Sequence, residues 1–269
     1  MFPDASGIDD LTMQKIAREL NLAETIFVLP PTRPDCCARV RIFTPNQEMA
    51  FAGHPIVGAS FVLLDDGIIS KRSDHFILDV KVGPVPVRVE QGERPLIWLT
   101  TPSIVWGAYY ERAHCAEVLG LRSDDLLEIT PQLLSAGNPN IFIAVKEKEA
   151  VDRARLDLAG LLTLKGGQKE AVCVFVFTPT AEGAYSRMFA PEHGIPEDPA
   201  TGSATGPLAA YMLRHKLVPG IAGARFHSEQ GTKIGRKSIL HVQINDDQGA
   251  DGIEVGSHVT PIAQATMTL

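Results

Sequence analysis

The sequence predicts an α+β protein made of two similar units, each with several strands and one buried helix. Two observations lead to this class. Short runs rich in β-branched and aromatic residues recur along the whole chain, as in TIFVL and VCVFVF. A segment of the form R-x-F-x-P occurs at residues 41–45 and again at 187–191, and each copy precedes a loop and a proline that opens an apolar helix.

The first unit begins with a helix. Residues 9–21 carry apolar side chains at helical spacing, after aspartates that can cap a helix start. The segment 51–64 is apolar on every side after its proline, which predicts a helix that lies inside a unit with no face toward solvent. The predicted strands are 25–29, 38–43, 75–80, 85–90 and 96–100.

The second half repeats this order after a junction near residues 101–108. A second helix of small and apolar residues is predicted within 198–217. Two other segments, 112–126 and 151–164, have helical spacing. The predicted strands are 140–145, 172–179, 185–191, 239–244 and 252–255. We therefore interpret the chain as a duplicated αβ unit that forms a pair of similar domains.

The composition excludes several classes of protein. The net charge is −7 and no dense block of Lys and Arg occurs, so nucleic acid is not an expected partner. No apolar run is long enough to span a membrane, and the N-terminus has no signal-peptide pattern, so we expect a cytoplasmic protein. The cysteines form neither a disulfide framework nor a metal-binding spacing, and we expect no metal; they are Cys36, Cys37, Cys115 and Cys173.

Candidate site residues lie at the predicted starts of the two buried helices. His54 and Asp198 each stand before a proline, which is favoured at the first position of a helix, and Asp198 is also a good N-cap. A helix N-terminus offers free N–H groups and partial positive charge to an anion such as a carboxylate. Small residues that let a ligand approach the backbone follow at Thr201, Gly202 and Ser203.

These residues also have structural interpretations. Asp198 and its proline can simply cap a helix, and a histidine beside proline can be a hydrogen-bonded structural residue. Glu24, directly before a predicted strand, is either a solvated carboxylate at a strand entry or a buried general acid/base that faces the helix starts. The residues alone leave these alternatives open.

Three segments together carry a family resemblance. They are IARELNLAETIFVLPP, the R-x-F-T-P stretch that leads into AGHPIVGA, and RMFAP followed by EDPATGSATGPLAAYML. With them the chain resembles the PhzF-like proteins, named for the phenazine biosynthesis isomerase, over nearly its whole length. The resemblance implies the diaminopimelate epimerase-like fold, in which two similar, pseudo-symmetric domains each curl a mixed sheet around a central helix. The domains would be 1–104 and 105–269, with the last strands able to cross back to the first.

The resemblance also implies roles for single residues. Glu24 corresponds to the acid/base of the family, and Gly53, His54, Asp198 and Ser203 line the site, hold the substrate carboxylate or assist proton movement. The implied reaction is a cofactor-independent isomerisation by proton relocation on carbon, in a protein that is often a homodimer. Related epimerases use two cysteines at the positions of His54 and Asp198, so a two-thiol racemase is disfavoured.

One departure and two alternatives accompany the resemblance. Family members usually begin with a further strand and a G-N-P-type loop before the segment that opens this chain, so we expect the first sheet to lack its usual first strand. An epimerase or dehydratase of an amino or hydroxy acid could use the same fold. A non-catalytic binding protein is the third interpretation, and the joint presence of Glu24, His54, Asp198 and Ser203 argues against it.

Overall fold

The computed structural model describes residues 1–245 and 252–268. The first half of the chain contributes the strands β1 (Thr25–Leu29), β2 (Ala38–Phe43), β3 (Glu48–Met49), β4 (His75–Val80), β5 (Gly83–Glu90) and β6 (Leu96–Thr100). The second half contributes β7 (Val105–Tyr109), β8 (Gln132–Ser135), β9 (Pro139–Ala144), β10 (Cys173–Thr180), β11 (Gly183–Ala190), β12 (Ile195–Asp198), β13 (Arg225–Gln230), β14 (Ser238–Ile244) and β15 (Ile253–Ser257).

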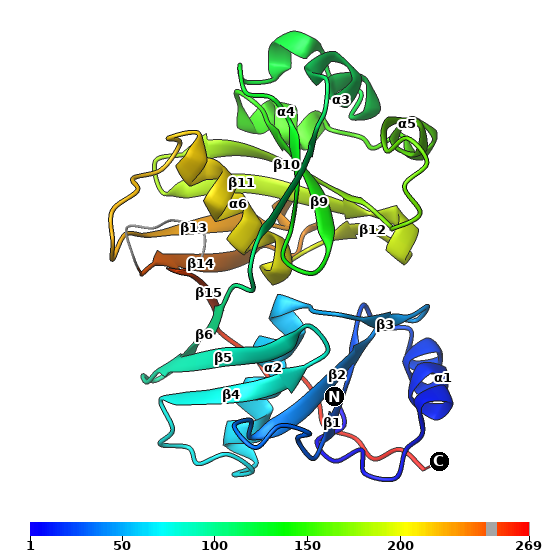
Figure 1. The fold of residues 1–269 in the computed structure, drawn as a ribbon, viewed down its shortest axis with the longest axis vertical. Helices are drawn as coiled ribbons and strands as arrows, with labels where there is room; N and C mark the ends of the chain where they lie inside the picture. The colour runs from blue at the N-terminus through cyan, green and yellow to red at the C-terminus, as the bar shows by residue number, and fades with distance from the viewer. Residues whose placement is uncertain (246–251, 269) are drawn as a thin grey trace.

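These strands form one mixed sheet that runs through both halves. Its order is β1-β2-β4-β5-β6-β15-β14-β13-β11-β10-β9-β8-β7, with β3 paired to β2 and β12 to β11. The pairs β2–β4, β9–β10 and β11–β13 are parallel. Figure 1 shows that the molecule divides into two halves, joined where β6 of the first pairs antiparallel with β15. The α+β class predicted from the sequence is confirmed.

Each half contains one of the predicted apolar helices in its core. The helix α2 (Gly53–Asp65) buries Ile56 and Leu63 completely against the strands of the first half. The helix α6 (Gly202–Arg214) does the same in the second half, where Leu208 and Tyr211 are fully buried. Neither helix has a polar face, because strands surround both of them.

The helix α1 (Asp10–Leu20) belongs to the first half and packs on its outer side, against β1 and β2 (Figure 1). Asp9 caps its start by accepting a hydrogen bond from the backbone N–H of Thr12, and Asn21 ends it in the left-handed region at φ 49°. Residues before the helix also contact the sheet, since Phe2 forms a parallel bridge with Phe27 of β1. The predicted helix 9–21 is therefore correct.

The R-x-F motif forms the same local structure in both halves. The Arg41 guanidinium lies 5.1 Å from the centre of the Phe43 ring and pairs with Glu48 of β3 at 2.8 Å. In the second half Arg187 lies 4.8 Å from the Phe189 ring and pairs with Glu197 of β12 at 2.7 Å. In each half the arginine thus fixes a short strand that leads toward the start of the central helix.

Two predicted helices are wrong in extent. The segment 112–126 is α-helical only as α3 (Arg112–Val118), because Gly120 adopts φ 63° and turns the chain, and the short 3₁₀ helix η1 (Ser123–Asp125) follows the turn. The segment 151–164 is divided between α4 (Lys148–Arg153) and α5 (Leu158–Leu164). The Asp157 side chain accepts hydrogen bonds from the first N–H groups of α5 and so starts a new helix.

Five strands escaped prediction, namely β3, β7, β8, β12 and β13. The sequence of β13, RFHSEQ, carries mostly polar residues, and β7 is largely exposed. Such segments become strands because a neighbour offers a free edge, which neither periodicity nor β propensity reveals.

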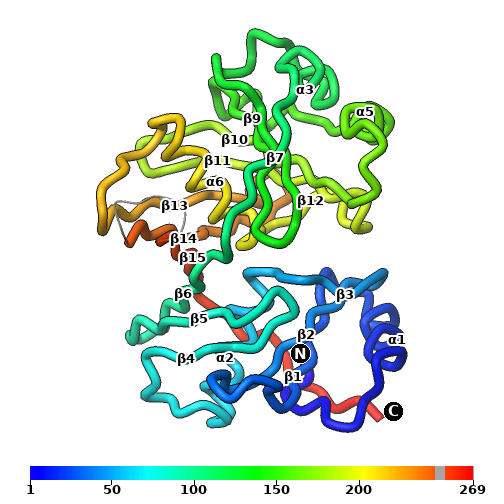
Figure 2. The backbone as a smooth tube through the Cα atoms, viewed as in Figure 1, coloured from blue at the N-terminus to red at the C-terminus, as the bar shows by residue number. Residues whose placement is uncertain are grey.

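The end of the chain returns to the first half. Beyond β15, Val259 packs against the apolar core of the first half. Figure 2 shows the red C-terminal tail passing along this half to a point near the N-terminus.

Candidate active site

The starts of the two central helices touch each other through glycine. A Cβ atom added to Gly53 would lie 2.7 Å from the backbone of Gly202, and one added to Gly202 would lie 3.0 Å from the Cα atom of Gly53. Only residues without a side chain permit this approach. The contact brings both helix N-termini, with their free N–H groups, to one place between the halves.

The predicted helix starts are shifted. Pro55 is the third residue of α2, whose N-cap is Ala52. Asp198 ends β12, and the N-cap of α6 is Thr201, so the prediction that Asp198 caps the helix is wrong. The physical reason is that Asp198 pairs with Met188 of β11, which keeps it in the sheet.

All the site residues predicted from the sequence line one pocket between the halves. They are Glu24, Gly53, His54, Asp198, Thr201, Gly202 and Ser203. The pocket encloses about 40 Å³, a small volume for a metabolite. Residues that the sequence analysis did not select also line it, among them Asn138, Cys173, Met188 and His193.

Glu24 and His54 form an ion pair in the wall of this pocket. The Glu24 side chain is only 10% exposed, and its Oε2 lies 3.1 Å from Nε2 of His54. Apart from this ion pair with His54, Oε2 has no hydrogen-bond partner within the described residues. Glu24 is thus not the solvated strand-entry carboxylate that one interpretation allowed, but a buried acceptor at the pocket.

The charges around His54 determine its protonation. Burial alone would lower the pKa of His54, but the Glu24 and Asp198 carboxylates and the Ala200 carbonyl raise it to about 9. Although protein surrounds it, 40% of the side chain is open, because it faces the pocket. At neutral pH His54 is therefore a cation beside the Glu24 carboxylate.

Asp198 lies in a network of hydrogen bonds. Its carboxylate accepts from the Thr201 hydroxyl, and the Gln230 side-chain amide donates to the Asp198 carbonyl at 2.7 Å and to the Thr201 oxygen at 2.8 Å. Burial raises the pKa of Asp198, against the His54 cation and the Thr201 hydrogen bond, which lower it. These hydrogen bonds fix the part of the pocket wall that the second half provides.

Three pocket residues that the sequence analysis missed come from separate loops and strands. Asn138 donates to the Phe51 carbonyl at 2.7 Å, which ties the halves together. Cys173 begins β10, and burial raises the pKa of its thiol to about 12, so the thiol stays protonated. His193 follows the second R-x-F-x-P motif, and this position was the one sequence signal that could have indicated it.

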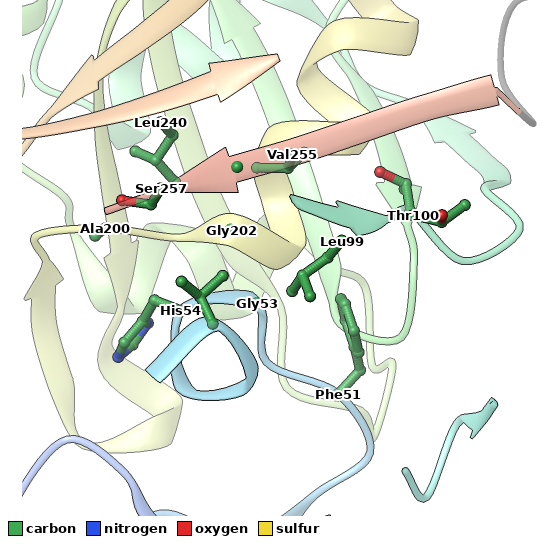
Figure 3. Close-up of a pocket in the computed structure, with 13 residues that line it drawn as sticks. Phe51, Gly53, His54, Leu99, Thr100, Ala200, Gly202, Leu240, Val255 and Ser257 are labelled. Carbon is green, nitrogen blue, oxygen red and sulfur yellow. The ribbon is translucent and has the colours of Figure 1, made fainter. Parts of the chain in front are cut away.

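A neighbouring pocket shares Gly53, His54 and Gly202 with the first (Figure 3). Its other lining is mostly apolar, with Phe51 and Leu99 among the residues that face it. His54 is the one ionisable residue in its described lining. The pocket that contains Glu24 and Asp198 is therefore the one with several ionisable side chains in its described lining.

Neither a metal cluster nor a membrane span is found in the described part of the chain. Within residues 1–245 and 252–268, no three His, Cys, Asp or Glu side chains are grouped so that they could hold a metal ion. No helix within those ranges has the length and apolar character to cross a membrane.

Comparison with known proteins identifies relatives over most of the chain. The chain is 31% identical over 245 residues to the trans-2,3-dihydro-3-hydroxyanthranilate isomerase of Pseudomonas aeruginosa, which covers 90% of this chain and 83% of that protein. It is 32% identical over 256 residues to an uncharacterised isomerase of Clostridium acetobutylicum, with coverage of 91% and 83%. Both relatives are named as isomerases, and this chain is an enzyme of the same kind.

Solved structures agree with this assignment. A predicted epimerase from Pseudomonas aeruginosa has a TM-score of 0.81 and 32% identity, covering 100% of this chain and 92% of that one. A probable proline racemase from Agrobacterium radiobacter, 14% identical, shares the fold with a TM-score of 0.68 and coverage of 97% and 82%. The family described as phenazine biosynthesis-like protein matches residues 1–264, and the chain belongs to that family.

Proposed function

We propose that this protein is a cofactor-independent isomerase of a small carboxylate-bearing metabolite, with Glu24 as the general acid/base that moves a proton between carbon atoms. The observation that carries the proposal is the buried Glu24 carboxylate, whose Oε2 is paired only with His54 in the described residues and which lines a pocket between two helix N-termini. A carboxylate with so few partners has a lone pair available for a substrate proton.

The substrate carboxylate is assigned to the helix starts. Gly202 and Ser203 are the first residues of α6, and Gly53 is the first of α2, so their N–H groups have no partners within the helices. These N–H groups and the helix dipoles favour an anion. Thr201 and Asp198 hold this wall in position through their mutual hydrogen bond.

The proton balance of the reaction needs no other reactant. Glu24 as carboxylate takes a proton from one carbon of the substrate, and the carboxylic acid that results returns a proton to another carbon as the double bond shifts. The His54 cation, 3.1 Å from Glu24, stabilises the negative charge that develops in the pocket. Asp198 faces His54 and assists proton movement through it.

The test uses trans-2,3-dihydro-3-hydroxyanthranilate, the substrate in the name of the Pseudomonas relative. We expect NMR in D₂O to show isomerisation with deuterium entering at carbon, because the acid form of Glu24 exchanges its proton with water. The Glu24→Gln variant should lose about 10²- to 10⁴-fold in kcat while its circular dichroism is unchanged. A Glu24→Gln variant with wild-type turnover would refute the assignment.

Epimerisation or dehydration on the same site is the second candidate, because the relative of solved structure described as a predicted epimerase is 32% identical to this chain. The same NMR experiment on an amino or hydroxy acid, followed by chiral chromatography, distinguishes it. Inversion would replace the isomerase proposal, whereas binding without turnover of any such acid would favour a non-catalytic protein.

The proposal extends to organisation. We propose that residues 1–104 and 105–269 are the two domains, with β15 shared at their boundary, and that the protein is a cytoplasmic homodimer. Light scattering coupled to size-exclusion chromatography tests the dimer, since the calculated mass of one chain is 29.1 kDa.

A further inference from the structure

His193 occupies the pocket wall opposite the catalytic pair without a role in the steps above. It ends the short 3₁₀ helix η2 (Pro191–His193), in the second half of the chain, and its side chain is buried, with 8% of the residue exposed. Its Nδ1 lies 3.2 Å from the side-chain nitrogen of Gln47, in the first half. Gln47 and His193 each stand two residues after the proline of an R-x-F-x-P motif, so equivalent positions of the repeat touch each other beside the pocket.

This contact determines which nitrogen of His193 carries the proton. An amide NH₂ group can only donate, so Nδ1 must accept the hydrogen bond from Gln47. In a neutral imidazole the proton then resides on Nε2. Burial lowers the pKa of His193, against the opposing influence of Glu192 and Glu24, which keeps the ring neutral at physiological pH.

The Nε2–H group so defined has no acceptor. Nε2 is buried and has no hydrogen-bond partner within the described residues, as is true of Oε2 of Glu24 in the same pocket. An unsatisfied buried donor is costly, and native proteins rarely retain one without a purpose. The pocket thus contains an acceptor from the first half that is paired only with His54, and a donor from the second half that has no acceptor in the described residues.

We propose that His193 is a substrate-binding residue that sets specificity: its Nε2–H donates to a hydroxyl or carbonyl oxygen which the substrate carries in addition to its carboxylate. Gln47 is the positioning residue that selects the donating tautomer. The inference rests on the proposed function, because it requires the carboxylate to bind at the helix starts. The substrate class is therefore an oxygen-substituted carboxylic acid.

The first test needs no substrate. In protein labelled with ¹⁵N-histidine, long-range ¹H–¹⁵N spectra report the protonation of each ring nitrogen, and the His193→Phe variant assigns the signal. We expect a neutral ring protonated at Nε2 from pH 6 to 8, and a changed tautomer in Gln47→Glu, whose carboxylate would accept from Nδ1. A wild-type ring protonated at Nδ1 would overturn the inference.

The second test compares two stable aromatic ligands that differ in one group. Calorimetry measures binding of 3-hydroxyanthranilate and of anthranilate, which lacks the hydroxyl. His193→Phe should weaken the first by about tenfold and leave the second unchanged, as loss of one hydrogen bond predicts. His193→Gln, which places an amide N–H near the position of Nε2, should recover part of the loss and also serves if the Phe variant fails to fold.

The matched control is His215, a half-buried histidine whose Nε2 is buried without a hydrogen-bond partner in the described residues and which lies outside the pocket lining. His215→Phe should bind both ligands as the wild type does. Equal binding of 3-hydroxyanthranilate by wild type and His193→Phe would overturn the inference while leaving the role of Glu24 untouched. If the wild type bound neither ligand and turned over no substrate, the proposed function would fail. The tautomer spectra would still test whether Nε2 of His193 carries the proton.

Discussion

The two halves support the pocket through the same arginine contacts but contribute different side chains to it. In both, an arginine lies over a phenylalanine ring and pairs with a glutamate on a short strand beside the pocket. The first half then presents Glu24 and His54, two ionisable groups with incomplete hydrogen bonding. The second presents Asp198 in a closed network with Thr201 and Gln230.

The difference concerns which side chains are available for proton transfer and which are held in hydrogen bonds. Under the proposed function Glu24 transfers protons, which requires an available lone pair, and its Oε2 is paired only with His54 in the described residues. Asp198, which in the same proposal assists proton movement through His54, is also held by the hydrogen bond from the Thr201 hydroxyl. The repeat therefore conserves the scaffold on both sides and places the acid/base on one.

The largest effect on stability should come from the arginine of the second half. Arg187 donates to Glu197 and also to the carbonyls of Val151, Asp152 and Ala154. Arg187→Ala would remove the arginine donor from the buried Glu197 carboxylate and from all three carbonyls, of which Val151 keeps the Ala154 N–H, and we expect a loss of about 3–5 kcal/mol in the free energy of unfolding by urea.

The comparison with Arg41→Ala sharpens this. Glu48 keeps an ion pair with Lys81 at 3.2 Å when Arg41 is removed, so the loss should be smaller, about 1–3 kcal/mol. Equal losses in the two variants would mean that the two arginines are equivalent supports.

The next effect concerns the glycine contact between the helix starts. The Cβ atom of Gly53→Ala would lie within 2.9 Å of the Ser203 backbone nitrogen and closer still to Gly202, so backbone must move. We expect a loss of about 1–3 kcal/mol in unfolding free energy. Gly58→Ala in the same helix is the control, because a Cβ there meets nothing within 4 Å; it should gain about 0.5–1 kcal/mol. A tolerated Gly53→Ala would show that the helix starts need no close contact.

A smaller effect distinguishes the two carboxylates that face His54. Glu24 raises the pKa of His54 more than Asp198 does, so Glu24→Gln should bring it down from about 9 further than Asp198→Asn. Titration of the His54 Cε1 proton by NMR measures both shifts. A larger shift in Asp198→Asn would assign the principal partner of His54 to the second half.

The smallest effect is the pH dependence of stability. Because the pKa of His54 is raised from 6.5 to about 9, the folded state binds more protons than the unfolded state between these values. The stability that this charge contributes is fully present below pH 6.5 and is lost as pH rises through 9. We expect the urea midpoint to fall modestly across this window, since the ring is partly open to solvent, and to fall less in Glu24→Gln. An equal fall of the urea midpoint in the wild type and in Glu24→Gln would contradict the ion pair.

The parts of the fold that the sequence predicts are those where composition alone decides the structure. The segments TIFVL and VCVFVF are strands, and the segments after Gly53 and Gly202 are buried helices, because no other arrangement hides so many apolar side chains. The strand β13 and the exact starts of α2 and α6 depend on neighbours distant in the chain. Asp198 illustrates this, since its pairing with β11 overrides its preference for a cap.

The site divides in the same way. Glu24, His54 and Asp198 stand in recognisable motifs and do line one pocket, whereas their roles remain proposals. His193 and Asn138 were missed because their significance arises from partners in the other half, Gln47 and Phe51. A single sequence does not reveal which loops of two units will meet.

The pairing of β6 with β15 has a consequence for how the protein is made. On the ribosome the first half emerges early, yet one edge of its β6 stays open until residues 253–257 have been synthesised. An open strand edge invites pairing with other chains. The part that appears first is thus completed last, and a nascent chain that stalls before β15 carries an exposed edge on β6.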